Sequence, residues 1–349
     1  MDIYIQAAEH ISVQKPLSDG WLDAPIEYNS TYIRAIEPDY KSRLSPNIIR
    51  RTGNIIKRAI ITSRAAVINS GIDKPDAIIS GTGLGCIENT EYFLDAMVRK
   101  GEELLQPAYF MQSTHNSISS AVAIDLQCNG YNSTYSHKAI SFESALEDAC
   151  LQFDGRKIKS ALVGGYDEMT PEYFLLLSRI GYWRVDSDDE PLKRGKEAFS
   201  GETSVSFMLS SEKNEKTICR TGGVHLLYKP SEESLQFAIS DLLSKNGLCI
   251  NDVDAIFTGI SGNSNNDEIY YRFAPILFGE KPLAGYKHVF GESYTAAGLG
   301  MYAAATCIRK QRIPQHLLLN GGKEIRNPKT LLLHNHSDGK NHSLILLTI

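Results

Sequence analysis

The sequence lacks any cysteine arrangement that could hold a metal ion or form a redox pair. Its six cysteines are scattered between Cys86 and Cys307 and include no Cys-x-x-Cys motif, the spacing that zinc and dithiol sites commonly use. We therefore expect reduced thiols, most of them buried in the core. Neither a metal site nor a cofactor is predicted.

Long apolar runs and an excess of positive charge are also missing. No stretch reaches the roughly 18 consecutive apolar residues of a membrane helix, and the segment from Met1 to His10 lacks a basic region followed by an apolar one. The formal net charge is −5 and the isoelectric point is near 6.0, so no bulk attraction draws the chain to nucleic acid or to an anionic membrane. These absences favour a cytoplasmic protein that binds neither.

What the sequence does contain is a repeated string. Residues 76–83 read as a short apolar strand entering a glycine-rich turn, and nearly the same string returns at residues 254–261. A second pair agrees with the first. Residues 134–150 read as a strand, a turn and a helix of small residues, and residues 286–308 repeat that order.

Two related α/β halves explain both pairs, and chance recurrence of short strings is the alternative. We place the halves at residues 1–225 and 226–349. A single helix is predicted from about Ser45 to Asn69, because Ser45-Pro46 and Asn69-Ser-Gly71 are capping signals at its two ends. Residues 341–349 are expected to form a closing strand.

Five short motifs follow one another in an order known from one enzyme family. They are Gly130-Tyr-Asn132 with Thr134, Gly164-Gly165-Tyr-Asp-Glu168 with Thr170-Pro171, Ala198-Phe199-Ser-Gly201-Glu202, Thr258-Gly259-Ile-Ser261 reaching Asn266-Asp267-Glu268, and Lys287 with Gly291-Glu292 and Ala296-Ala-Gly298. Together they resemble the β-ketoacyl synthase family. That resemblance implies the thiolase-like fold, an α/β protein of duplicated halves arranged in five layers, αβαβα.

The resemblance also implies where the catalytic residues would lie, and most of them are absent. The position of the nucleophilic cysteine is taken by Ala139, the two histidine positions by Thr258 and Glu292, and only Lys287 is retained. Condensation needs a thiolate to hold the acyl chain and donors that stabilise the developing enolate. Alanine offers no nucleophile, and an ionised glutamate repels an enolate. The gating loop Phe-Gly-Phe-Gly-Gly is replaced by residues 335–341, without either phenylalanine. We therefore predict no catalytic residue.

A relocated nucleophile is the main alternative. Ser136, Ser141 and Ser144 lie close to Ala139 and would suit an acyl-transferring or hydrolysing enzyme. Ser136 and His137 are adjacent on an expected strand, so their side chains point to opposite faces and do not form a nucleophile–base pair. A homodimeric module that senses acyl thioesters without turnover is a third hypothesis.

The remaining histidines indicate little chemistry. His334, His336 and His342 alternate near the end of the sequence and suggest a metal, but no fixed partner cluster accompanies them. His115 lies where such folds begin a dimer-contacting helix, which favours an N-cap or interface hydrogen bond over catalysis.

An inactive copy of a dimeric condensing enzyme can still shape the tunnel of its partner. The resemblance therefore implies a chain-length factor that pairs with an active ketosynthase, and more narrowly the short synthase-like proteins of bacterial aryl polyene and flexirubin pigment clusters. An acyl carrier protein is a further candidate partner, for which Arg50-Arg51 and Lys57-Arg58 are a candidate docking site. Self-association of the chain alone stays open.

Six residues are candidates for the tunnel wall or the subunit interface. They are Phe110, Met111, His115, Tyr135, His137 and Phe142. A bulky apolar side chain at such a place would limit how much acyl chain fits. For the apolar candidates, an ordinary core position is the alternative.

Overall fold

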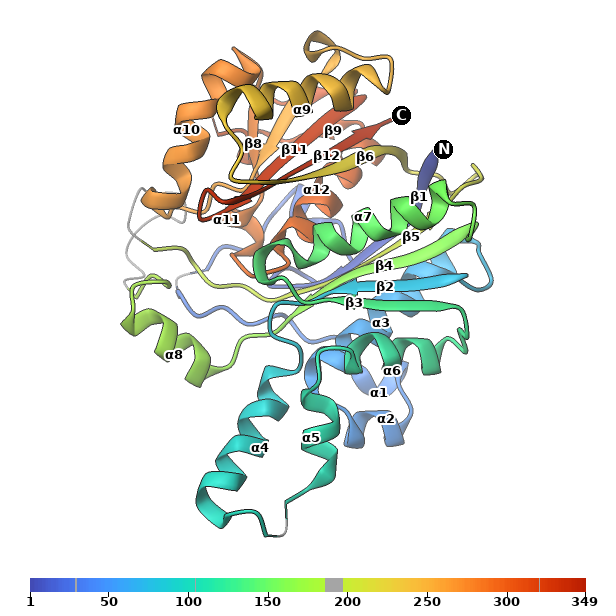
Figure 1. The fold of residues 1–349 in the computed structure, drawn as a ribbon, viewed down its shortest axis with the longest axis vertical. Helices are drawn as coiled ribbons and strands as arrows, with labels where there is room; N and C mark the ends of the chain where they lie inside the picture. Colours follow the sequence, from blue (N-terminus) through green and yellow to red (C-terminus); the bar gives the residue numbers. More distant parts are fainter. Residues whose placement is uncertain (29, 104, 186–196, 320) are drawn as a thin grey trace.

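Ten strands form one mixed sheet in a computed structural model that describes residues 1–28, 30–103, 105–185, 197–319 and 321–349 (Figure 1). The strands are β1 (Ile3–Ile11), β2 (Ala77–Gly81), β3 (Tyr131–Tyr135), β4 (Ser160–Asp167), β5 (Thr203–Ser210), β6 (Cys219–Tyr228), β7 (Ala255–Thr258), β8 (Leu283–Gly285), β11 (Thr330–Ser337) and β12 (Asn341–Thr348). A separate short pair consists of β9 (Arg312–Ile313) and β10 (Ile325–Arg326).

The order of the strands repeats. Across the sheet it runs β3-β2-β4-β5-β1-β6-β12-β11-β7-β8. If the strands of each half are numbered along the chain, both halves read 3-2-4-5-1 from their outer edge, and the two first strands, β1 and β6, meet in the middle. The predicted boundary after residue 225 falls inside β6, the strand that opens the second half. The expected closing strand is β12.

The repeated string has the same structural role in both halves. The Asp76 carboxylate accepts the backbone N–H groups of Lys159 and Ser160 at 2.8 and 3.0 Å, where β4 begins. In the second half, the Asp254 carboxylate accepts the N–H groups of the two residues at the start of β11, at 2.6 and 2.9 Å. An acceptor for the N–H groups at the start of a strand is thus supplied in the same way at both places.

The helices form three layers around the two halves of the sheet. The central layer contains α7 (Ser141–Asp154) and α12 (Ala296–Arg309) (Figure 1). Outside the first half lie α3 (Asn54–Ser70) and α6 (Ser117–Asp125), and outside the second lie α9 (Glu232–Ser244) and α10 (Ser264–Phe278). With the sheet halves between them, these layers give the predicted five-layered αβαβα fold.

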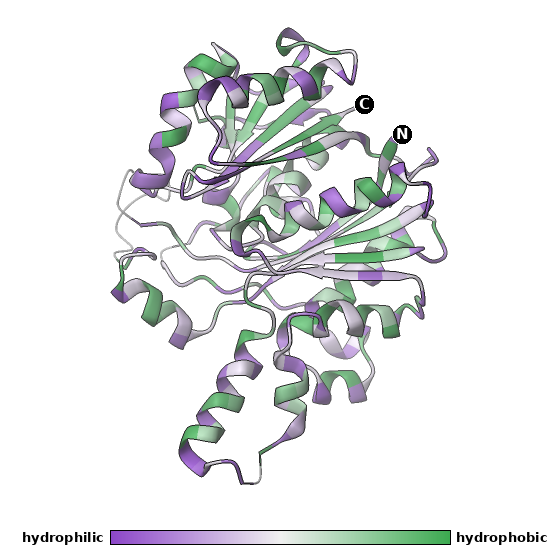
Figure 2. Ribbon diagram, in the orientation of Figure 1, coloured by the Kyte–Doolittle hydropathy of each residue, from purple (hydrophilic) through white to green (hydrophobic). Residues whose placement is uncertain are grey.

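Three apolar clusters fill the spaces between the layers. Alternate strand residues face different clusters: in β2, Ile78 packs toward α3, whereas Ala77 and Ile79 join the central cluster. Residues Ala296 to Ile308 of α12 are all buried, as expected for a helix covered on every side. Figure 2 shows the hydrophobic strands and the central helices of this interior.

The predicted helix from Ser45 to Asn69 is interrupted. Its caps are correct, since Ser45 accepts the N–H of Ile48 and Gly71 ends the helix at φ 72°. However, the chain leaves α2 (Pro46–Arg51) at Thr52, which is extended, and begins α3 at Asn54. The single-helix prediction was wrong because the N–H of the intervening Gly53 donates to Gln112 Oε1 at 2.9 Å, a non-local contact.

The remaining helices lie outside these layers, except for α11 (Lys287–Phe290), whose Val289 and Phe290 belong to the central cluster. Helices α4 (Ile87–Lys100) and α5 (Pro107–Ser113) project from the body as a pair, while α1 (Tyr40–Arg43), α8 (Pro171–Arg179) and α11 are short (Figure 1). In the part of the chain that the structure describes, no helix combines the length and the apolar character needed to cross a bilayer.

Candidate functional site

The turn between β3 and α7 holds the position predicted to replace the nucleophile. Residues Lys138–Ile140 form a 3-10 turn, in which Lys138 has a φ of 51° and Ala139 is half-buried. A positive φ is costly for a lysine and is maintained only where its surroundings enforce it. Ala139 thus lies in a strained elbow two residues before α7 begins.

Ser141 closes this elbow. Its hydroxyl lies 2.7 Å from the carbonyl oxygen of Lys138 and accepts the N–H of His137 at 2.8 Å. The end of β2 passes very close, because a Cβ at Gly81 would lie 2.3 Å from the Ser141 backbone. A residue with a side chain cannot replace glycine there without moving the helix.

The two positions predicted to replace the histidines are engaged in structural contacts. Thr258 is fully buried at the end of β7, and its hydroxyl donates to the carbonyl oxygen of Ala284 on the neighbouring strand at 3.3 Å. Glu292 follows α11 and pairs with Lys287 at 2.5 Å. Its second oxygen accepts the N–H of Ser293 at 3.0 Å.

The pairing of Lys287 with Glu292 changes the electrostatics of the site. Both side chains are largely buried, with exposed fractions of 6% and 16%. An ammonium paired this closely has its charge compensated, so it offers little attraction to an anionic substrate. Lys287, predicted to be the retained member of the catalytic set, is therefore paired with the residue predicted to replace a histidine.

The loop after β7 is held by a buried carboxylate. Asp267 accepts the N–H groups of Ser261 and Gly262 at 3.0 and 2.7 Å. Desolvation raises the pKa of Asp267, and the two hydrogen bonds oppose that rise. This segment is therefore fixed in position.

Glu143, on the first turn of α7, is a residue that the sequence reasoning missed. It is fully buried, and its Oε1 accepts hydrogen bonds from Asn335 Nδ2 and Ser343 Oγ, both at 3.0 Å. The Tyr270 and Tyr286 hydroxyls lie 3.4 and 3.5 Å from Asn335 Oδ1. Buried polar side chains from both halves therefore meet beside the first turn of α7.

Comparison with solved structures identifies the fold, although no protein-family model and no curated protein matches the sequence. The ishigamide ketosynthase/chain length factor matches with a TM-score of 0.84 at 15% identity, over 99% of this chain and 98% of that one. A β-ketoacyl synthase from Burkholderia phymatum STM815 matches with 0.85 at 14% identity, over 100% and 99%. The ketosynthase ApeO in complex with its chain length factor ApeC, from Xenorhabdus doucetiae, matches with 0.79 at 16% identity, over 100% and 98%.

The chain has the β-ketoacyl synthase fold. The predicted fold class is thereby confirmed, and the match extends over nearly the full length of the chains compared. Two segments that contain sequence motifs, the end of β7 and the α11 segment, lie close together, because Thr258 pairs with Gly285, two residues before α11. The turn at residues 138–140 contacts β11.

The six tunnel or interface candidates occupy three environments of this ketosynthase fold. Phe110 and Met111 are 57% and 69% exposed on α5, and His115 is exposed just beyond it. Tyr135 is half-buried at the end of β3, with its ring 6.2 Å from the exposed imidazole of His137.

Phe142 is different, because it is fully buried in the central cluster. Its ring lies 5.6 Å from that of Phe207, and a Cβ at Gly165 or Gly298 would lie within 3.2 Å of it. This is the position of an ordinary core residue, which agrees with the alternative given for it.

The three C-terminal histidines contact one another. His334 Nε2 lies 3.0 Å from His342 Nδ1, and burial lowers the pKa of His334 to about 3. Gly339 N–H donates to His336 Nδ1 at 3.2 Å. Among the described residues, no three His, Cys, Asp or Glu side chains form a group suited to a metal ion.

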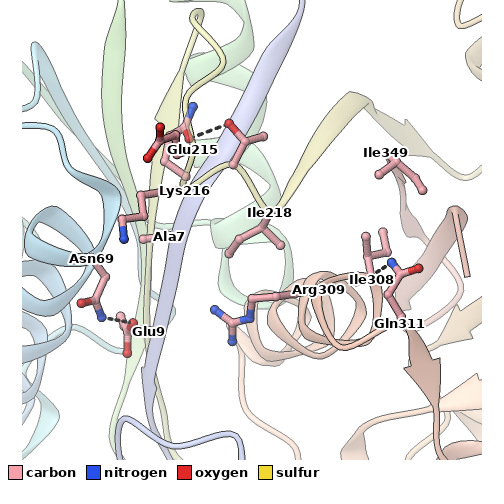
Figure 3. A pocket seen from close by; sticks show the side chains of 12 residues that line it. Ala7, Glu9, Asn69, Glu215, Lys216, Ile218, Ile308, Arg309, Gln311 and Ile349 are labelled. Atoms are coloured by element: carbon pink, nitrogen blue, oxygen red, sulfur yellow. Dashed lines mark hydrogen bonds between the residues drawn. The ribbon is translucent and has the colours of Figure 1, made fainter. Parts of the chain in front are cut away.

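A cavity of about 500 Å³ lies far from the elbow (Figure 3). Glu9, Asn69 and Arg309 line it and also line an adjoining cavity of about 390 Å³. Because Arg309 is the last residue of α12 and the helix begins on the side of the elbow, the cavity is at the opposite end of the central layer. Asn69 donates to Glu9 at 2.6 Å there.

Proposed function

We propose that the chain is a non-catalytic, chain-length-factor-like subunit that pairs with an active ketosynthase in polyene or fatty-acid-type biosynthesis. The observation that carries the proposal is a ketosynthase fold that extends over nearly the whole chain, in which the sequence register predicts Ala139, Thr258 and Glu292 at the three reactive positions. Thr258 and Glu292 are engaged by neighbours, which supports a structural rather than a catalytic role for them. The register that assigns Ala139 to the nucleophile remains a prediction.

An unpaired sheet edge supports the pairing. Among the described residues, β3 hydrogen-bonds only to β2, so its other edge has no strand beside it. Exposed apolar side chains flank that edge, with Ile124 on α6, Tyr131 on β3 itself and Leu151 on α7. Proteins seldom leave such an edge uncovered, and a partner there would bury these side chains. The exposed Phe110 and Met111 on α5 extend the same surface.

The structural neighbours are consistent with this assembly. Two of them are described as a ketosynthase with a chain length factor, and another as a ketosynthase with its acyl-carrier protein. We extend the first arrangement to this chain, with a carrier protein as a further partner. The notion of Lys57-Arg58 as a carrier-docking pair does not hold for Arg58, which is 1% exposed and bonded to Glu37 and Glu202.

The alternative of a serine enzyme has one observation in its favour. His137 Nδ1 lies 3.3 Å from Ser144 Oγ, seven residues along the chain. However, the Ser144 hydroxyl donates to the Ile140 carbonyl oxygen at 2.8 Å, so its proton is directed away from the imidazole. Intact-mass measurement after incubation with acylated carrier protein separates the two functions, because an acyl adduct on this chain would favour the enzyme.

Co-expression tests the main proposal. Together with a ketosynthase that has the Cys-His-His set and is encoded beside its gene, the chain should purify as a one-to-one complex. Leu151→Glu should weaken that complex at least about tenfold, as expected for a central apolar contact, whereas Ile68→Glu, an exposed apolar site on α3, should not. The proposal fails if the chain purifies alone and condenses malonyl and acyl carrier-protein substrates at a normal ketosynthase rate.

A further inference from the structure

Burial of the Glu143 side chain at this position is energetically unfavourable. Its side chain is fully buried on α7 in the first half and reaches Asn335 and Ser343 in the second half. Within the described part of the chain its Oε2 has no hydrogen-bond partner. Desolvation raises the pKa of Glu143. An incompletely paired buried carboxyl group costs stability, which suggests that it is retained for another reason.

The other half shows that the fold does not require this carboxyl group. Glu143 is the third residue of α7, and the third residue of α12 is Gly298. There, a Cβ would lie 2.7 Å from Val205. The repeat of the strand order makes Val205 the counterpart of Ser343, because Val205 pairs with Gly165 as Ser343 pairs with Asn335.

The two central helices, α7 and α12, therefore contact the sheet through chemically different residues. Around α12 the third position is a glycine facing Gly165 and Val205, so backbone and side chain pack closely. Around α7 the same position is a carboxyl group facing an amide and a hydroxyl. Because α12 packs against the sheet with a glycine at this position, the fold does not need a carboxyl group there. The polar contact made by Glu143 is therefore specific to α7, the helix that follows the elbow.

We propose that Glu143, with Asn335 and Ser343, forms a polar stop that keeps acyl chains out of this subunit. This inference rests on the proposed function and deepens it, because the growing chain would then be confined to the tunnel of the partner. Glu143 lies four residues beyond Ala139, about 6 Å along a helix, so it stands directly beneath the elbow. Residues 136–138, which lead into that elbow, are exposed.

The physical basis is desolvation. A methylene chain entering below the elbow would have to lie against the Glu143 carboxyl group, the Asn335 amide and the hydroxyl groups of Ser343, Tyr270 and Tyr286. It could replace none of their hydrogen bonds, and leaving buried polar groups without partners is strongly unfavourable. Removing the carboxyl group would leave a space that methylene groups can fill.

The test is the binding of a fluorescent conjugated polyene fatty acid, cis-parinaric acid, to the full chain. The parent protein should show no saturable binding. Glu143→Ala should bind the probe saturably, with a Kd at least about tenfold below the highest probe concentration at which the parent shows no saturation, because each buried methylene is worth roughly fourfold in Kd. Glu143→Gln, which keeps the shape and the acceptor oxygen, should behave like the parent. Glu147→Ala, half-buried one turn further along α7, should also leave binding unchanged.

Equal, saturable binding to the parent and to Glu143→Ala would overturn the proposal, as would a folded Glu143→Ala protein that gains no affinity. If that variant does not fold, Asn335→Ala opens the opposite wall at a position whose counterpart is already glycine, and the same gain is expected. Binding is measured on the isolated chain, so its outcome does not depend on whether a ketosynthase copurifies. Failure of the stop and failure of the pairing are thus separate results.

Discussion

A buried ion pair is present in each half of the molecule, and the two pairs are built differently. In the first half, Arg58 of α3 lies 3.2 Å from Glu202, and both side chains are 1% exposed. In the second half, Lys287 pairs with Glu292 at 2.5 Å, with somewhat greater exposure. Both pairs lie close to segments that resemble ketosynthase motifs.

The difference lies in how many segments each pair joins. Arg58 also bonds Glu37, and Glu202 accepts the N–H groups of Ala35 and Met169 at 2.5 and 2.9 Å. A guanidinium can bridge several acceptors because its donors have a fixed fork geometry, whereas an ammonium acts as a point charge. The first pair therefore holds the fold together. The second pair joins only residues of its own loop. Side chains there can therefore be replaced with a smaller loss of stability than at Arg58.

The largest predicted effect comes from removing the cation of each pair. Arg58→Met should lower the free energy of unfolding by about 3–5 kcal/mol, because Glu202 would be left buried without compensation. Lys287→Met should cost less, roughly 2–3 kcal/mol, because Glu292 is more exposed and keeps its bond to Ser293. Urea unfolding measures both.

Arg50→Met is the control for these variants, since Arg50 is exposed at the end of α2. It should change the unfolding free energy by no more than about 0.5 kcal/mol. If Lys287→Met costs as much as Arg58→Met, the contrast drawn between the two halves is incorrect.

A smaller predicted effect concerns the dependence of stability on pH, which should differ between the equivalent ends of β4 and β11. Burial raises the pKa of Glu168 to about 8, against the attraction of Arg58. Because the folded state keeps this proton to a higher pH than the unfolded chain does, the stability of the parent falls as pH rises from about 4.5 to about 8. Glu168→Gln removes this decline, and relative to the parent it should gain about 1–3 kcal/mol between pH 5 and 8.

Asp338 provides the matched control. It occupies the place in the second half that Glu168 occupies in the first, but it is exposed. Asp338→Asn should leave the dependence of stability on pH unchanged. Parallel pH profiles for the parent and Glu168→Gln would show that Glu168 does not hold the extra proton.

The smallest effect tests the symmetry of the repeat itself. Asp76→Ala and Asp254→Ala each remove an acceptor of two backbone N–H groups. Each should cost only about 1 kcal/mol, because water can reach these strand ends. The shift of the urea midpoint should be similar for both variants. A much larger loss in one of them would mean that the two aspartates have diverged in role.

The duplicated fold could be predicted because its signals are local. The strings that begin at Asp76 and Asp254 keep both their strand pattern and their capping carboxylate, so the repeat is readable without the structure. The caps at Ser45 and Gly71 are likewise set by neighbouring residues. The break at Gly53 was not predictable, since it depends on Gln112, which is distant in the sequence.

The candidate site shows the same limit. A sequence register can predict that the cysteine and the histidines are absent, but it cannot predict the contacts of the residues expected in their places. Glu143 looks like an ordinary residue of a first helical turn, where acidic side chains are common. Its contacts with Asn335 and Ser343 join parts of the chain about 190 to 200 residues apart. Helix α7 also contains Glu147, Asp148 and Asp154, so its sequence does not distinguish Glu143 from the other acidic residues.

The position of β1 has a consequence for the synthesis of the protein. This strand, Ile3–Ile11, leaves the ribosome before both of its neighbours, β5 and β6, which lie between Thr203 and Tyr228. An apolar nascent segment must therefore wait without pairing while the long intervening part of the chain is translated. Slow elongation or chaperone shortage should lower the yield of this protein more than that of one whose first strand pairs with its second.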